Sequence, residues 1–370
     1  MIKFKKKIQF YFKKFFQLIF LLIYGKVKYI NNKITSKNII KRKIENIVSD
    51  IKDSKTYFSY KIRNGRVYTD YVEHVAIIDG NTLVNEVSYQ QVSGELKDAS
   101  KNIVLTKGTP RIKKKIKGRV LSLVQGASGN KNYAHWLLDI LPKIKLCTEH
   151  YPLKEIDFFY IPVLQNFQKK TLTILNIDEN RIINSDSYRH IMANELIAVD
   201  HPWYHKGFIH NQYEFLPSWI IYWLRDVFLK HAKHFDNNEK IYIDRTDSKF
   251  KHCQIQNNKE VFDFLEKLGF TKYKVGGLSF FEQIYLFNNA KIIVGAHGAA
   301  FTNLAFCKPH TNIIEIKPVS HPNNQYKRIS QINNLNYRSI QTKELNETQK
   351  NLGDIYLPLE KLEHYIKSFG

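Results

Sequence analysis

The sequence is poor in cysteine, with three in 370 residues, at Cys147, Cys253 and Cys307. Their number is odd and they lie far apart, so the sequence shows neither a disulfide framework nor the ligand spacing of a metal site. Because disulfides persist mainly in oxidising compartments, a reducing cytoplasmic location is the simplest interpretation. We expect no metal ligands in the chain.

The sequence also lacks an apolar run long enough to cross a bilayer. The uncharged stretch at residues 15–24 is shorter than the roughly 20 residues that a spanning helix needs. A tilted span over residues 8–24 is an alternative, but it would place Lys13 and Lys14 near its middle, at a cost on the order of several kcal/mol. No small-residue cleavage site follows, which argues against a signal peptide.

Acidic residues are scarce: 34 Asp and Glu stand against 57 Lys and Arg, for a formal net charge of +23. Residues 1–50 hold 13 Lys and Arg against only Glu45 and Asp50, a net of +11. A second basic cluster occupies residues 111–119, and it either guides a phosphorylated acceptor or is a solvated loop. Such charge favours anionic partners, namely nucleic acid, anionic lipid or phosphorylated substrates.

Residues 1–35 combine this positive charge with apolar residues at helical spacing. The apolar stripe of the expected helix consists of Phe4, Ile8, Phe12, Phe15, Ile19 and Leu22. A basic amphipathic helix lies in the plane of an anionic membrane surface. We therefore expect a membrane-associating segment at residues 1–35 and a peripheral protein on the cytoplasmic face of the inner membrane. The alternative is a helix that docks on the protein's own core.

The rest of the chain alternates strand-like and helix-like segments, which predicts an α/β protein with parallel sheets. We expect a first lobe that binds the acceptor at residues 60–235, a second lobe at 236–345 and a C-terminal tail helix at 346–370. A polar break near residues 232–240 separates the lobes. In the second lobe we expect strands at residues 240–244, 291–294 and 312–316, and helices at 259–268, 280–288 and 299–306.

The stretch at residues 291–303 reads K-I-I-V-G-A-H-G-A-A-F-T-N. It predicts a strand that breaks at Gly295 and a helix that begins near Ala299. Such a turn points unpaired N–H groups and the positive end of the helix dipole at a ligand, and it suits phosphate or pyrophosphate. Gly295 and Gly298 would let a ligand approach the backbone, and His297 can donate to its oxygen atoms. The stretch lacks the Walker and full dinucleotide fingerprints, and the alternative is an ordinary turn.

Five short blocks follow in order along residues 120–320. They read N-Y-A-H-W-L-L-D-I-L-P (132–142), I-Y-I-D-R (241–245), L-S-F-F-E-Q (278–283), G-A-H-G-A-A-F-T-N (295–303) and I-E (314–315). As an ordered set they resemble glycosyltransferase family 61. The resemblance implies a GT-B-like fold, with two Rossmann-type lobes facing a cleft, in which the second lobe binds the nucleotide sugar. It also implies an inverting transfer of a sugar from that donor, with no essential metal or other cofactor.

The resemblance further implies the partners and the setting. The partners are a nucleotide sugar and a glycan or lipid-linked saccharide acceptor at an anionic membrane surface, and no nucleic acid. Bacterial members of the family act in capsule or surface-polysaccharide synthesis, and others modify plant xylan or animal glycoproteins. We therefore expect a hexosyl- or pentosyltransferase of bacterial surface-polysaccharide synthesis.

One departure from the family pattern leaves other functions open. After the strand that ends in Arg245 the family usually carries an arginine pair, where this chain has Cys253 and Gln254, and Asn258 replaces an acidic residue. The loss of a phosphate contact leaves open a catalytically silent relative that binds a sugar nucleotide or scaffolds a synthesis complex. A nucleic-acid-binding protein is the third alternative, but no RNA or DNA motif supports it.

An inverting transfer needs groups that stabilise the departing diphosphate. Arg245 offers a bidentate guanidinium, and His297 with the backbone amides of Gly298 and Ala299 offers a second anion site. These residues lie at strand ends, where α/β sheets bind ligands. The alternatives are a salt bridge from Arg245 to Asp247 and a His297 that only caps its helix.

Two carboxylates are candidates to bind the ribose hydroxyls of the donor. Glu315 lies at a strand end, and its alternative is a buried structural carboxylate. Glu282 lies three residues after Ser279, so it can instead close a capping box at the start of its helix.

The transfer also needs a base that takes the proton of the acceptor hydroxyl. His135 and Asp139 lie four residues apart, on one face of the helix expected after residues 120–124. Either is a candidate base, with Asp139 orienting His135 or receiving its proton. The alternative is a core histidine beside Trp136, with Asp139 on the surface.

Overall fold

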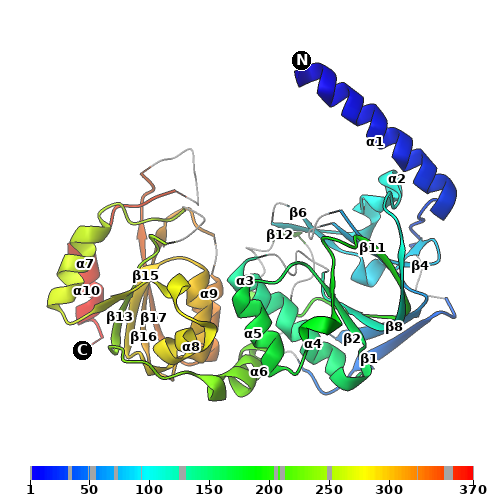
Figure 1. The fold of residues 1–370 in the computed structure, drawn as a ribbon. Coiled ribbons are helices and arrows are strands. Elements are labelled where there is room, and N and C mark those ends of the chain that lie inside the picture. The colour runs from blue at the N-terminus through cyan, green and yellow to red at the C-terminus, as the bar shows by residue number, and fades with distance from the viewer. Residues whose placement is uncertain are drawn as a thin grey trace. The chain divides into compact units, whose positions relative to one another are not determined.

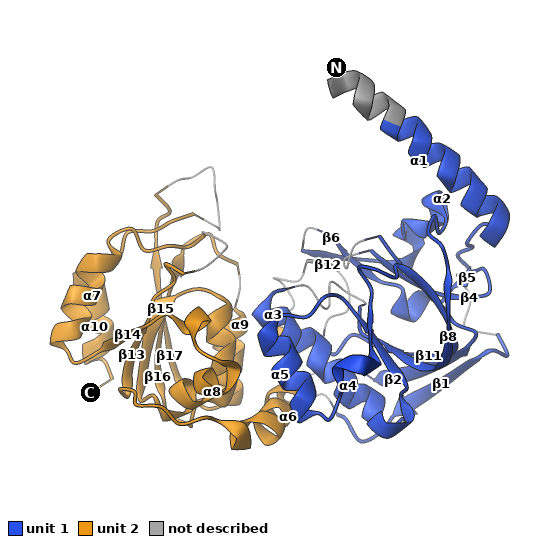
Figure 2. Cartoon of the chain, in the orientation of Figure 1, with its two compact units in different colours: residues 1–209 blue, residues 210–370 orange. Residues whose placement is uncertain are grey.

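The structure is a computed structural model that describes residues 2–31, 36–48, 50, 56–70, 74–92, 94–124, 131–203, 207–208, 213–247, 252–322, 324–345 and 353–369. The chain forms two compact units, residues 1–209 and 210–370 (Figures 1 and 2). This division differs from the boundary expected at residues 235/236, because helix α6 (Ser218–Phe228) packs within the second unit. There Arg225 Nη1 donates to the carbonyl oxygens of Ala305 (2.8 Å) and Cys307 (2.7 Å).

The first unit contains a large mixed sheet and a small antiparallel one. The large sheet contains β1 (Ile39–Ile44), β2 (Tyr57–Arg63), β3 (Arg66–Thr69), β4 (Val75–Asp79), β5 (Thr82–Leu83), β8 (Lys114–Ser122), β9 (Phe158–Ile161), β10 (Ile182–Asn184) and β11 (His190–Val199). The small sheet contains β6 (Gln90–Val92), β7 (Glu95–Lys97) and β12 (Gly207–Phe208). The helices include α1 (Ile2–Tyr24), α2 (Val104–Lys107), α3 (Tyr133–His135), α4 (Leu141–Thr148) and α5 (Asn166–Ile174).

Only part of the large sheet has the parallel pairing of a Rossmann-type lobe. Strands pair in parallel along β10–β9–β8–β11, whereas β2 and β3 pair antiparallel to β11 and continue into antiparallel neighbours. The sequence prediction of a Rossmann-type lobe therefore fits the segment from β8 to β11. It does not fit the antiparallel strands, whose tight connections require no crossover helix.

The second unit has a five-stranded sheet in the order β14–β13–β15–β16–β17, and every pairing in it is parallel. Its strands are β13 (Lys240–Ile243), β14 (Thr271–Tyr273), β15 (Ile292–Ala296), β16 (Asn312–Pro318) and β17 (Asn336–Thr342). Its helices, besides α6, include α7 (Asn258–Lys267), α8 (Phe280–Asn289), η10 (Ala299–Phe306), α9 (Gln325–Ile332) and α10 (Leu359–Lys367). Here the predicted strands, helices and parallel sheet are confirmed.

Helices cover both faces of this sheet, with α7 and α10 on one face and α8 and α9 on the other (Figure 1). Helix α10 belongs to the core rather than to a separate tail, because Leu362 is buried in one cluster with Ile355, Val294 and Ile314. The expected tail at residues 346–370 is thus part of this unit where it is described, and residues 346–352 lie outside the described residues.

Helix α1 ends at Tyr24, whose hydroxyl accepts a hydrogen bond from the backbone N–H of Lys113 (3.0 Å). The exposed large apolar side chains of this helix are Phe10, Tyr11, Phe12, Phe15, Phe16, Leu18, Leu21, Leu22 and Ile23. Several of them are neighbours in the chain, as at residues 10–12 and 21–23, so the exposed apolar surface extends beyond the single stripe that the sequence predicts. In the part of the chain that the structure describes, no helix has the length and apolar character needed to span a bilayer.

Candidate functional site

Three predicted donor-binding residues lie at one edge of the sheet in the second unit. In the parallel register Gly295 of β15 pairs with Ile243 of β13 on one side and with Glu315 of β16 on the other. Arg245 lies two residues after the end of β13, and His297 follows β15 directly. The strand order therefore brings Arg245 and His297 to the carboxyl ends of adjacent strands, where α/β sheets bind ligands. Glu315 lies beside them within β16, three residues before the end of that strand.

His297 and Glu315 belong to a buried hydrogen-bonded cluster that also includes Tyr337 on β17. Nδ1 of His297 is hydrogen-bonded to Oε1 of Glu315, and the Tyr337 hydroxyl donates to Oε2. Burial raises the pKa of Glu315, but His297, Lys317 and Tyr337 outweigh it and hold that pKa below its ordinary value. Because protein groups occupy both carboxylate oxygens, Glu315 positions His297, as in the buried structural alternative, and the structure gives no support to ribose binding by Glu315.

This pair leads to a prediction about stability. We expect Glu315→Gln to lower the melting temperature by about 5–15 °C at neutral pH, because removing one charge of a buried pair costs about 3–5 kcal/mol. The pKa of this carboxylate is lowered in the folded protein. Its contribution to the free energy of unfolding is therefore complete above the unfolded-state pKa of about 4.3 and is lost as pH falls through the folded-state pKa. Thermal melts from neutral to acidic pH should show the two proteins converging. The exposed Glu266→Gln is the control, and a wild-type-like melt for Glu315→Gln at neutral pH would contradict the prediction.

The guanidinium of Arg245 lies directly over Gly298. A Cβ atom placed on Gly298 would stand 2.6 Å from Cζ of Arg245 and 2.7 Å from Nη1. Nη1 is buried and has no hydrogen-bond acceptor among the described residues, and burial lowers the pKa of the guanidinium. A buried cationic donor without an acceptor is costly unless an anion binds it. Arg245 therefore has the properties of a phosphate ligand.

The structure corrects the role that the sequence suggests for the two glycines. The space beside Gly295 is filled, since an added Cβ would lie 2.9 Å from Ile243 and 3.1 Å from the Phe301 ring. The space beside Gly298 is filled by Arg245. Gly295 and Gly298 therefore admit neighbouring side chains, not the ligand itself, to the backbone.

The remaining predicted donor residues are Ala299 and Glu282. Ala299 begins η10, and the anion contact expected at its backbone N–H stays a prediction. Glu282 closes the capping box of α8 by accepting from the N–H of Ser279 (2.8 Å), and it also lies 3.6 Å from Lys233 Nζ. The structure thus favours the capping alternative for Glu282.

Arg245 and His297 together form what is called the seat below. Two histidines that the sequence does not mark as candidates lie beside this seat. Nδ1 of His252 is buried without a partner among the described residues, and burial, Arg245 and His297 lower its pKa to about 4. The ring of His321 lies on that of His297, with centroids 3.9 Å apart. His252 adjoins Cys253, where the sequence departs from the family pattern. That departure was the signal that could have identified His252. No motif marks His321.

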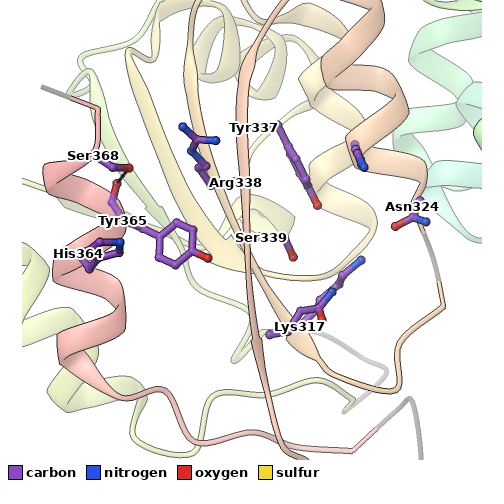
Figure 3. A pocket seen from close by; sticks show the side chains of 10 residues that line it. Lys317, Asn324, Tyr337, Arg338, Ser339, His364, Tyr365 and Ser368 are labelled. Atoms are coloured by element: carbon purple, nitrogen blue, oxygen red, sulfur yellow. Dashed lines mark hydrogen bonds between the residues drawn. The ribbon is translucent and has the colours of Figure 1, made fainter.

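A pocket of about 490 Å³ adjoins the same sheet along edge strand β17 (Figure 3). Its lining residues are Lys317, Asn324, Lys327, Tyr337, Arg338, Ser339, Gln341, His364, Tyr365 and Ser368. Figure 3 shows Tyr337 and Lys317 on one side of β17 and Arg338 on the other, as the alternation of a strand requires. The described residues that line the pocket include no carboxylate, so their net charge is positive, and Tyr337 connects the pocket to Glu315.

In the first unit His135 and Asp139 form the predicted pair. Nδ1 of His135 lies 2.7 Å from Oδ2 of Asp139, and the indole N–H of Trp203 donates to Oδ1 (2.9 Å). The Asp139 side chain is 1% exposed and that of His135 19%. Asn132 caps helix α3 by accepting hydrogen bonds from the N–H groups of Ala134 and His135. Because protein donors hold both oxygens of buried Asp139, His135 is the member placed to meet a substrate, with Asp139 orienting its ring.

A chain of aromatic contacts extends from this pair. The ring of His201 lies 5.7 Å from that of Trp203 and 5.8 Å from that of Tyr89. Burial, followed by the charges of Asp200 and Asp139, raises the pKa of Tyr89 well above its ordinary value. The Tyr89 hydroxyl is buried without a partner among the described residues. These residues come from distant parts of the chain and carry no motif.

Neither unit shows three or more His, Cys, Asp or Glu side chains grouped as metal ligands within the described ranges. The expectation that the reaction needs no metal stays a prediction.

The chain resembles known proteins over the region that contains both sites. Residues 133–314 match the family Glycosyltransferase 61. A β-1,2-xylosyltransferase of Oryza sativa subsp. japonica is 23% identical over 159 residues, which are 41% of this chain and 26% of the relative. The match therefore spans about a quarter of the length of that relative. The family match begins just before His135 and includes Arg245 and His297, so residues 133–314 form a glycosyltransferase 61 domain.

Proposed function

We propose that the protein is an inverting, metal-independent glycosyltransferase that moves a sugar from a nucleotide-sugar donor to a glycan or glycolipid acceptor. The observation that carries the proposal is the buried Nη1 of Arg245, which has no acceptor in the described part of the chain and lies within a glycosyltransferase 61 domain. Arg245 and His297 neutralise the departing diphosphate, and His135, oriented by Asp139, takes the proton of the acceptor hydroxyl. The proposal includes a GT-B-like fold.

The donor and the biological setting are part of the same proposal. The rice relative is named for the transfer of xylose, so UDP-xylose is the first donor to examine. Synthesis of a bacterial surface polysaccharide is the proposed setting. The excess of basic residues agrees with acceptors that carry phosphate, including lipid-linked saccharides.

Nucleotide binding is the direct test. We expect UDP, GDP or CMP, or one of their sugars, to raise the melting temperature of the second unit, and we expect release of free nucleotide when an acceptor extract is added. Stabilisation by DNA but by no nucleotide would favour the nucleic-acid alternative. Nucleotide binding without release in any acceptor extract would favour the silent relative suggested by Cys253 and Gln254.

We further propose that helix α1 attaches the protein peripherally to an anionic membrane, at the cytoplasmic face of the inner membrane. Residues 2–31 contain eight lysines and no acidic residue, and the helix exposes many apolar side chains. Attraction to anionic headgroups and insertion of apolar side chains act together in such helices. Deleting residues 2–24 should abolish flotation with phosphatidylglycerol vesicles, whereas phosphatidylcholine vesicles should bind the full chain weakly. Undiminished flotation of the deletion variant would contradict this attachment.

A further inference from the structure

His252 occupies an unusual position in the second unit. It precedes Cys253, at the place where the family usually carries two arginines, and this chain therefore lacks those guanidinium groups. The following segment is fixed in place, because the N–H of Gln254 donates to Oδ1 of Asp354 (3.0 Å) and Ile255 forms a parallel bridge with Ile355. These contacts hold the backbone that directly follows His252.

The surroundings of His252 are electropositive. Arg245, which follows β13, and His297, which follows β15, both act on its ring, and Asp354 from the segment before α10 is the opposing charge. Asp354 already accepts from the backbone of Gln254 and from Nε2 of Gln256 (2.8 Å). The neighbouring ionisable groups of the seat are Cys253, Glu315, His321 and Tyr326.

Two buried nitrogen atoms in this seat have no partner among the described residues, Nη1 of Arg245 and Nδ1 of His252. Arg245 lies over Gly298, the chain neighbour of His297, and the charge of His297 acts on the ring of His252. Nδ1 of His297 is committed to Glu315. Unpartnered buried polar atoms are unfavourable, and two of them in one seat indicate that this seat binds a ligand. The ligand must be an anion, since the seat is cationic.

We propose that His252 replaces the missing arginines as a ligand of the donor diphosphate, and that its ring takes up one proton from solvent when the nucleotide sugar binds. This inference rests on the proposed function. A neutral ring accepts the proton, and the resulting N–H donates to a phosphate oxygen. No bond of the donor breaks in this step, and the proton is the only group that moves.

The physical reason for proton uptake is the difference in the pKa of His252 between the free protein and the complex. In the free protein burial, followed by the charges of Arg245 and His297, lowers this pKa to about 4, so the ring is neutral at physiological pH. A diphosphate cancels the repulsion from Arg245 and His297 and stabilises the imidazolium. The pKa of His252 is then higher in the complex, so affinity is greatest at low pH and falls as pH rises through the value in the complex.

Calorimetry with UDP-xylose, and with other nucleotide sugars if that donor does not bind, measures the proton directly. A UDP or GDP sugar is a diphosphate diester, which carries no phosphate proton that titrates near neutrality. Titrations at one pH in buffers of different ionisation enthalpy give the number of protons taken up. We expect close to one proton near neutral pH, and an affinity that falls by up to about tenfold per pH unit at higher pH.

Three variants separate His252 from the other histidines. His252→Asn should abolish the uptake and weaken binding by about tenfold or more. His252→Arg should abolish the uptake but keep tight, nearly pH-independent binding, since it restores a permanent cation. The matched control is His310→Asn, because His310 is exposed and has a φ of 64°, which asparagine tolerates. Melting temperatures confirm that each variant is folded.

The outcomes distinguish this inference from the proposed function. Nucleotide-sugar binding without proton uptake by the wild type overturns the inference and leaves the proposed function standing. Uptake that persists in His252→Asn also overturns it, and assigns the proton to another group of the seat. If no nucleotide sugar binds the wild type, both proposals fall.

Discussion

Asp139→Asn should lower kcat by about 10³–10⁴-fold and leave the donor Kd within about twofold. The carboxylate accepts from Nδ1–H of His135, which presents the other ring nitrogen as a base. An asparagine can turn its amide N–H towards Nδ1 and so favour the tautomer that cannot accept the acceptor's proton. The indole of Trp203 would still hold the other side of residue 139, so the geometry should survive the substitution. Steady-state kinetics and donor calorimetry measure the two constants separately.

Further variants separate chemistry from structure. His135→Ala should lower kcat as much as Asp139→Asn does. The double variant should lower kcat little further, because the two residues act as a unit. Trp203→Phe removes one donor to Asp139 and should have a smaller effect. The exposed Asp178→Asn in the same unit is the control. Full turnover by Asp139→Asn would remove the pair from the reaction, and a raised KM with unchanged kcat would place it in acceptor binding.

Local sequence signals were sufficient for the parts of the fold and site that depend on spacing along one element. His135 and Asp139 meet because residues four apart share a helix face. Arg245 and His297 share a sheet edge because parallel strands all end on one side. The first statement follows from helical periodicity and the second from the alternation of strands and helices, and the structure confirms both placements.

The features of the fold and site that the sequence did not predict depend on contacts between distant segments. Trp203 reaches Asp139 across 64 residues, and Tyr337 reaches Glu315 from a neighbouring strand. No local pattern specifies such pairings, yet they decide which carboxylate oxygens remain for a ligand. The sequence did not predict the mixed sheet of the first unit for a similar reason. Strands β2 and β3 are buried like the parallel strands, so their hydrophobicity did not reveal that they pair antiparallel to β11.

Gly298→Ala should weaken donor binding by about 10–100-fold, the loss expected when a charged hydrogen bond is removed. The added methyl group would occupy the position of the Arg245 guanidinium, only 2.6 Å from Cζ, and the side chain would have to leave its place beside His297. Arg245→Ala should cause a similar loss directly. Arg245→Lys should restore only part of the affinity, because an ammonium lacks the bidentate fork of a guanidinium.

The decisive measurement is a double-mutant cycle on the donor Kd. Because Gly298→Ala acts through Arg245, it should change the Kd by less than about twofold once Arg245 is alanine. The control is Gly277→Ala, since a Cβ there would meet no atom within 4 Å. Additive losses would mean that the methyl group blocks the ligand itself, and Gly298 would then admit the diphosphate to the backbone, as the sequence alone suggests. Strong coupling would show that the glycine serves the arginine and that the arginine holds the diphosphate.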